Sequence, residues 1–160
     1  MSTESFERDV VAGHEAAHLV IGSLCSGAKV HLKLSCDGEK WTGTGRLQAG
    51  TGQAGIARVA TALAGYAYEH ESKVDGAPSS PDTCPLTADI HSAKLATAGL
   101  AATGEQADYL DEGWAYAVQA IDRHAAQIEY VRDRLIELMV DSDNFEVADD
   151  QVQVWLSEVE

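Results

Sequence analysis

The chain contains 160 residues, of which 45% are apolar, and it carries 11 basic against 26 acidic side chains, for a net charge of −15. This length and apolar content suit one domain, spanning residues 1–160, that buries a core without disulfides. The strong negative charge repels nucleic-acid phosphates and anionic lipid surfaces, so neither nucleic acid nor a membrane is an expected partner.

The cysteines and the N-terminus indicate the cellular compartment. Cys25, Cys36 and Cys84 are odd in number and form no C-x-x-C pair, so the sequence predicts neither a disulfide framework nor a cysteine zinc site. The first seven residues are acidic where a secretory signal would be basic and then apolar, and no apolar run has the length of a transmembrane helix. We therefore expect a cytoplasmic protein.

A first helix, capped by Thr3 or Ser5, is predicted to run to about Leu24, and it contains the pentad His14-Glu15-Ala16-Ala17-His18. Residues four apart on a helix lie one turn above each other, so both imidazoles can bind one ion, and the HExxH spacing is typical of zinc hydrolases. Glu15 lies beside them and can take a proton from a water at the metal, as a general base. The alternative is a pair of core histidines whose ring nitrogens bond to backbone groups.

Two strands are predicted after this helix. Apolar residues alternate with polar ones over 29–36, as in a half-buried strand, and Asp37-Gly38 supplies a turn before a second strand, Trp41–Gln48. Gly43 and Gly45 leave room for another backbone, so we expect Gly43, Thr44 and Gly45 to form an edge that binds a peptide substrate. An ordinary surface hairpin is the alternative.

The rest of the chain is predicted to be helical, which makes the fold class mainly α, with a small β-hairpin or sheet after the first helix. An alanine-rich helix is expected at 53–71, a proline-containing loop at 73–85 and a helix capped by Thr87 at 88–96. A capping box at Thr103 starts a short helix at 103–110. A long amphipathic helix follows beyond Gly113, at 114–141, and a last short helix begins near 149.

A catalytic zinc site needs three protein ligands plus water, so a third donor has to come from elsewhere in the chain. The candidates are His31, Glu69, His70, Glu71, Asp89 and His91. The residues alone leave the choice open between Asp89, at a junction of loop and helix, and the group at 69–71.

Several segments resemble the peptidase domain of FtsH-type ATP-dependent zinc metalloproteases, in the order in which that family has them. Val11-Ala-Gly-His-Glu-Ala-Ala-His18 is similar to the family's metal-binding helix with one Gly-to-Ala difference. Ala64-Gly-Tyr-Ala-Tyr-Glu69 and Thr87-Ala-Asp-Ile90 resemble its next two conserved segments, and residues 121–138 resemble its long closing helix. The pentad is the one sharp motif among them.

The resemblance implies a ligand set and a partner. According to this resemblance, the third zinc ligand maps to Asp89. Glu69 matches a family glutamate near the site and is the second choice for the third ligand. Tyr66 replaces the family's usual arginine and Ala88 its asparagine. The relatives form rings driven by an ATPase, so we expect a possible homo-oligomer that acts without an attached ATPase or membrane anchor and takes folded substrates only with a separate unfoldase.

The sequence therefore predicts a zinc-dependent metalloendopeptidase that hydrolyses peptide bonds in flexible or unfolded polypeptides. His14, His18 and Asp89 hold Zn²⁺ and Glu15 is the base in this hypothesis. The alternative is a non-catalytic module that binds metal or proteins on the same fold. The retained Glu15 favours the enzyme, because a structural ion needs no base.

Overall fold

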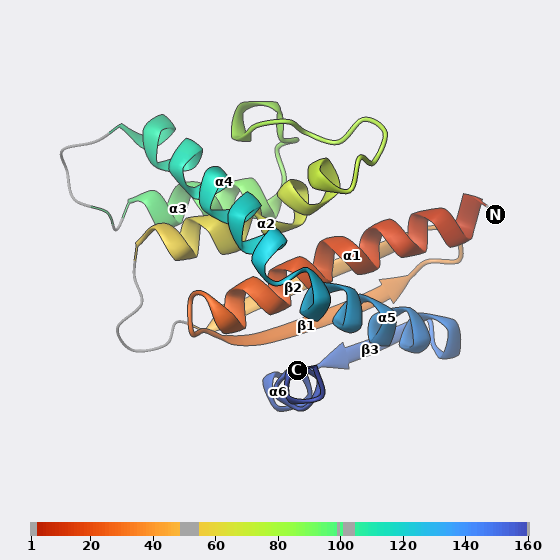
Figure 1. Ribbon diagram of the computed structural model, residues 1–160. Coiled ribbons are helices and arrows are strands. Elements are labelled where there is room, and N and C mark those ends of the chain that lie inside the picture. The colour runs from red at the N-terminus through yellow and green to blue at the C-terminus, as the bar shows by residue number, and fades with distance from the viewer. Residues whose placement is uncertain (1–2, 49–54, 99, 101–104, 160) are drawn as a thin grey trace.

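The computed structural model describes residues 3–48, 55–98, 100 and 105–159 (Figure 1). It is mainly helical, with a small three-stranded antiparallel sheet, so the predicted fold class is confirmed. The elements in chain order are α1 (Thr3–Leu24), β1 (Lys29–Cys36), β2 (Trp41–Gln48), α2 (Ile56–Glu71), the 3₁₀ helix η1 (Pro81–Thr83), α3 (Ala88–Thr97), α4 (Gln106–Arg123), α5 (Ala125–Asp141), β3 (Asn144–Val147) and α6 (Asp149–Ser157).

Helix α1 runs through the middle of the molecule, with α3 and α4 on one side of it and β3 with α6 on the other (Figure 1). Its inward stripe packs on α2, half of whose buried positions are alanine, and small side chains let the two helices approach closely. Ile21 of α1 and Leu63 of α2 are fully buried, and each contributes about 1.5–3 kcal/mol by leaving water. This close packing fixes the faces of both helices that carry the site.

The sheet has the strand order β2-β1-β3, which makes β2 an edge strand. Val30, Leu32 and Leu34 of β1 are buried while the residues between them are not, as the predicted alternation requires. The hairpin is confirmed, with Lys29 opposite Gln48 and Cys36 opposite Trp41. The third strand was not predicted, because β3 has only four residues and too short an alternation to detect.

The C-terminal helices differ from the prediction in their boundaries. We expected one long helix from beyond Gly113 to near Asp141, but α4 begins at Gln106, passes through Gly113 and ends at Arg123, before α5. Gly113 is needed for packing, since a Cβ there would lie 2.4 Å from Cγ1 of Val59 in α2. The break falls at His124, whose backbone leaves the helical range at φ −109° and ψ 24°.

The remaining helix limits are close to those expected. Helix α2 begins at Ile56, whereas the prediction began at 53, and residues 53 and 54 lie outside the described part of the chain, as does Thr103 of the expected capping box. Thr87 occupies the N-cap position of α3, as predicted, but its side chain makes no capping bond. None of the described helices is both long and apolar enough to cross a lipid bilayer.

Candidate metal centre

The structure brings His14, His18 and Asp89 together. His14 and His18 lie one turn apart on α1, and Asp89 lies in the first turn of α3. Oδ2 of Asp89 is 2.9 Å from Nε2 of His14 and 3.1 Å from Nε2 of His18, and the two Nε2 atoms are 3.2 Å apart. Within the described part of the chain, no other group of three or more His, Cys, Asp or Glu side chains has donor atoms close enough together to bind one metal ion.

The three donor atoms have the spacing of one face of a small tetrahedron. Zinc lies about 2.0–2.2 Å from nitrogen and oxygen ligands, so neighbouring ligands of a tetrahedral site are about 3.3–3.5 Å apart. The observed separations of 2.9, 3.1 and 3.2 Å are slightly smaller. A modest outward movement of the side chains would therefore accommodate the ion, and the donor set of two imidazoles and one carboxylate suits zinc.

The outer nitrogens of both imidazoles have the partners that ligating histidines usually have. Nδ1 of His18 donates to the backbone carbonyl of Thr61, at 2.8 Å. Nδ1 of His14 donates to Oε1 of Glu69, also at 2.8 Å. Such bonds hold the Nδ1–H tautomer and aim the lone pair of Nε2 at a metal. Glu69, the second-choice ligand, therefore lies on the far side of His14 from the donor cluster.

Helix α2 also supplies two contacts to His14 that the sequence analysis did not assign. A Cβ at Gly65 would lie 2.3 Å from Nε2 of His14, so only glycine leaves room for the ring. The ring of Tyr66 meets that of His14 edge to face, with centroids 4.9 Å apart. The hydroxyl of Tyr66 is 3.0 Å from Oγ1 of Thr87 and so connects α2 to the start of α3. The sequence signal that could have identified the first of these contacts is Gly65 itself, a glycine within an alanine-rich helix.

Replacing Gly65 with alanine is expected to weaken zinc binding by about 10- to 100-fold, the usual effect of disturbing the surroundings of a ligand. The new methyl group would displace the His14 ring from the donor cluster. Competition with a chelator measures the affinity. Gly45→Ala is the matched control, because a Cβ there meets nothing closer than a backbone oxygen at 4.0 Å. Equal zinc affinity in the two variants would contradict the prediction.

The other candidate ligands lie away from the cluster. His31 faces Glu146 of β3, 3.6 Å away, and the ring of His70 lies 6.2 Å from that of Trp114. His91 is exposed on α3. Glu71 lines a different cavity, described below. The geometry thus favours Asp89 among the alternatives that the sequence left open.

Glu15 is buried beside the donor cluster and is held against the edge strand. Its side chain is only 8% exposed, and its carboxylate makes no hydrogen bond or ion pair with another described residue. A Cβ at Gly43 would lie 2.3 Å from Oε1 of Glu15, so Gly43 lets β2 pass this carboxylate. The carboxylate is thus positioned at the site but keeps its lone pairs free to accept a proton.

A cleft of about 720 Å³ contains the donor cluster and Glu15. It is lined by residues from α1, α2, α3 and both strands of the hairpin. Of the predicted peptide-binding residues, Gly43 and Gly45 line it and Thr44 does not. Apolar side chains such as Val11, Leu19 and Leu95 line it together with polar ones, and Leu95 is 62% exposed. The cleft is large enough for several residues of an extended peptide.

Charges around the cluster favour a positive species between the three side chains. Burial opposes protonation of His14, but hydrogen bonds to Asp89 and Glu69 outweigh it and raise the pKa of His14 to about 10. Burial opposes protonation of His18 too, yet the charge of Asp89 raises its pKa. Burial of Asp89 is outweighed by the histidines, which lower its pKa. A divalent cation would bind in place of the protons on the two imidazoles.

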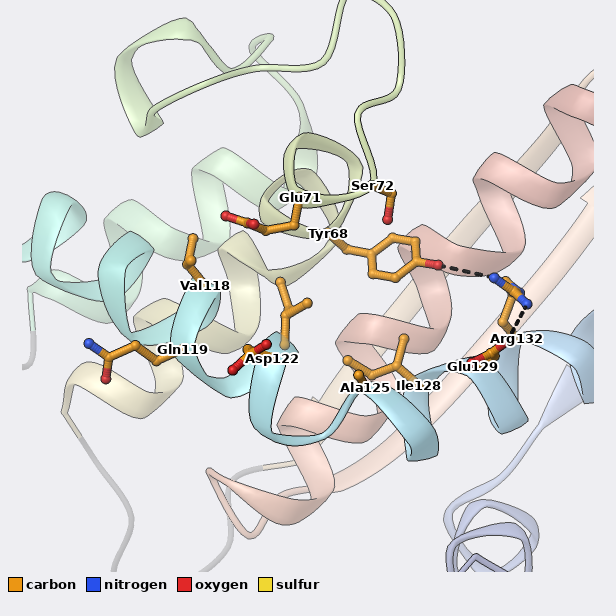
Figure 2. A pocket seen from close by; sticks show the side chains of 11 residues that line it. Tyr68, Glu71, Ser72, Val118, Gln119, Asp122, Ala125, Ile128, Glu129 and Arg132 are labelled. Carbon is orange, nitrogen blue, oxygen red and sulfur yellow. Dashed lines mark hydrogen bonds and ion pairs between the residues drawn. The ribbon is translucent and has the colours of Figure 1, made fainter.

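A second cavity of about 610 Å³ lies between the end of α2 and the junction of α4 with α5 (Figure 2). Figure 2 shows the Tyr68 side chain reaching toward Arg132 of α5, and the hydroxyl is 3.5 Å from Nη1. Glu71, Asp122 and Glu129 lie on the cavity's rim, but the described residues place no histidine or cysteine among its lining. It therefore lacks the ligands of the first cleft.

Comparison of the chain with models of protein families gives no match, and comparison with curated proteins gives no significant one. The functional interpretation consequently depends on the motif and on the geometry of the site.

Proposed function

We propose that this protein is a zinc metallopeptidase that hydrolyses peptide bonds in flexible or unfolded polypeptides. The observation that supports it most is the arrangement of His14, His18 and Asp89, whose three donor atoms have near-tetrahedral spacing next to an uncommitted Glu15. This combination matches the chemistry of the HExxH motif, and the resemblance to FtsH-type peptidase domains agrees with it.

His14, His18 and Asp89 would hold the ion, with Glu69 and the Thr61 carbonyl fixing the two rings. When bound there, zinc would supply Lewis-acid chemistry for the scissile carbonyl and for the attacking water. The Glu15 carboxylate would take one proton from the attacking water as the water oxygen bonds to the carbonyl carbon. It would then pass this proton to the leaving amine nitrogen as the C–N bond breaks.

Strand β2 would orient the substrate. It pairs with β1 along one edge only, within the described sheet, and Trp41, Thr42, Gly43 and Gly45 line the cleft. An extended peptide can add to such an edge through main-chain hydrogen bonds. A folded protein presents no free extended segment, so cleavage of folded substrates would need a separate unfoldase.

The test is metal analysis of the purified protein together with cleavage of an unstructured substrate. We expect about one zinc per chain and cleavage of casein or unfolded peptides. A chelator should remove both the metal and the activity, and added zinc should restore them. A purified protein that takes up no zinc at neutral pH would contradict the proposal.

A further inference from the structure

We propose that Arg58 forms a carboxylate-binding subsite at one end of the cleft, so that the cleft selects peptides with a carboxylate about three to five residues from the bond at the metal centre. The inference rests on the proposed peptidase function and concerns the substrate of the same cleft. Arg58 lies in the first turn of α2 and lines the cleft.

The position of Arg58 on α2 directs it along the cleft. Ala62, Tyr66 and Glu69 follow it by four, eight and eleven residues, and all three line the cleft. With 3.6 residues per turn, these spacings place the four side chains within about 80° of one another on one face of the helix. Arg58 thus continues the row of α2 side chains that borders the donor cluster.

Arg58 has no ion-pair partner among the described residues, although acidic side chains outnumber basic ones 26 to 11. Of the four arginines outside the cleft, three have partners: Arg8 pairs with Asp9, Arg132 with Asp133 and Arg134 with Glu137. Arg58 is also exposed. Its planar guanidinium is therefore free to bind a carboxylate through two parallel hydrogen bonds.

The distance from Arg58 to the donor cluster sets the position of the selected carboxylate. A Cβ at Gly65 would lie 2.3 Å from Nε2 of His14, and Arg58 precedes Gly65 by seven residues, or about 10.5 Å along the helix axis. With the length of its side chain, which leans toward the start of the helix, the guanidinium lies roughly 10 to 16 Å from the cluster. An extended peptide covers about 3.3 Å per residue, so this distance corresponds to about three to five residues.

A second cation occurs at the same end of the cleft. Gly43 of β2 contacts Glu15, and Arg46, which also lines the cleft, follows it by three residues or about 10 Å of strand. Arg46 likewise has no ion-pair partner among the residues that the structure describes. Glu15, Glu69 and Asp89 make the metal centre negative, and Lys40, which also lines the cleft, lies on the opposite side of Gly43 from Arg46. Two arginines on one side and a single lysine on the other favour the substrate carboxylate in the Arg58 register.

The carboxylate could belong to an aspartate or glutamate side chain or to the C-terminus of the peptide. Both present the same planar anion to Arg58. The experiment separates them by using each peptide with a free and with an amidated C-terminus.

Binding is measured with a zinc-loaded Glu15→Gln variant, which should hold peptides without cutting them. The probes are fluorescein-labelled unstructured ten-residue peptides in which one glutamate is moved through an otherwise uncharged, glutamine-rich sequence. Fluorescence anisotropy at 50 and 500 mM NaCl gives the affinities. We expect a carboxylate in one register, or at the free terminus, to improve binding at least about fivefold at low salt and less at high salt.

Substitutions assign the preference to Arg58. Adding Arg58→Gln should abolish it, and Arg58→Glu should reverse it in favour of lysine at the same peptide position. Arg123→Gln is the matched control, because it removes one positive charge from the exposed last residue of α4, outside the cleft. The control should leave the preference unchanged.

Three results would overturn the subsite: equal affinity for glutamate and glutamine peptides, a preference that survives Arg58→Gln, or no binding by any peptide. The fate of the peptidase proposal is read separately, from cleavage by the wild-type protein. A protein that cuts nothing but shows an Arg58-dependent preference would be a binding module with the subsite intact. A protein that cuts peptides regardless of charge would be a peptidase without it.

Discussion

Replacing Glu15 with glutamine is expected to lower hydrolysis of an unstructured substrate by about 10²- to 10⁴-fold, the usual effect of losing a general base. Glutamine has nearly the same size, so it should fit against Gly43 as the carboxylate does. It cannot accept a proton from water. Zinc content and thermal stability should stay close to those of the wild type, because Glu15 is not one of the three clustered donors.

A second pair of variants reaches the same carboxylate from the strand. Gly43→Ala would push a methyl group against Oε1 of Glu15, whereas Thr44→Ala shortens a side chain that does not line the cleft. We expect the first to reduce cleavage without loss of zinc and the second to have a much smaller effect.

Equal, background-level cleavage by zinc-loaded wild type and Glu15→Gln across diverse unfolded peptides would contradict the peptidase proposal and favour a non-catalytic module.

Long periodic segments of the fold could be predicted from the sequence. The end of the first helix and the limits of both hairpin strands are as predicted, because 22- and 8-residue elements give many repeats of their periods. The break at His124 could not be predicted, since apolar residues such as Ile121, Ala125 and Ile128 keep a helical spacing across it. Strand β3 depends on pairing with β1, a tertiary contact that a four-residue segment does not encode locally.

The sequence also predicted part of the candidate site. His14, Glu15 and His18 belong to one helical turn, so their proximity follows from local geometry. Asp89 comes from 71 residues beyond His18, and only the resemblance favoured it over Glu69. The sequence alone could not show which carboxylate lies at Nε2 of His14, on the metal side of the ring, and which lies at Nδ1, on the opposite side. That distinction depends on how α2 and α3 pack around α1.

Asp89→Ala and Glu69→Ala are expected to weaken zinc binding to different degrees. Asp89 contributes one of the three clustered donors, so its loss should reduce affinity by more than the roughly 10- to 100-fold expected for an outer partner. Glu69 bonds the outer nitrogen of His14, so Glu69→Ala should stay within that range. Chelator competition measures both. Unchanged affinity in Asp89→Ala together with abolished binding in Glu69→Ala would show that the ligand set is wrong.

Proton release distinguishes the two roles further. The pKa of His14 is raised to about 10 and that of His18 is also raised, so His14 of the metal-free cluster is protonated at pH 7. Zinc needs the lone pairs of both rings, so binding should release protons and the affinity should rise with pH. Glu69→Ala removes one of the hydrogen bonds that raise the pKa of His14. In the pH range between the lowered pKa of His14 in that variant and about 10, the variant should release fewer protons than the wild type. Calorimetry in buffers of different ionisation enthalpy, repeated at several pH values, measures the release, and equal release at every pH would contradict the hydrogen bond between Glu69 and His14.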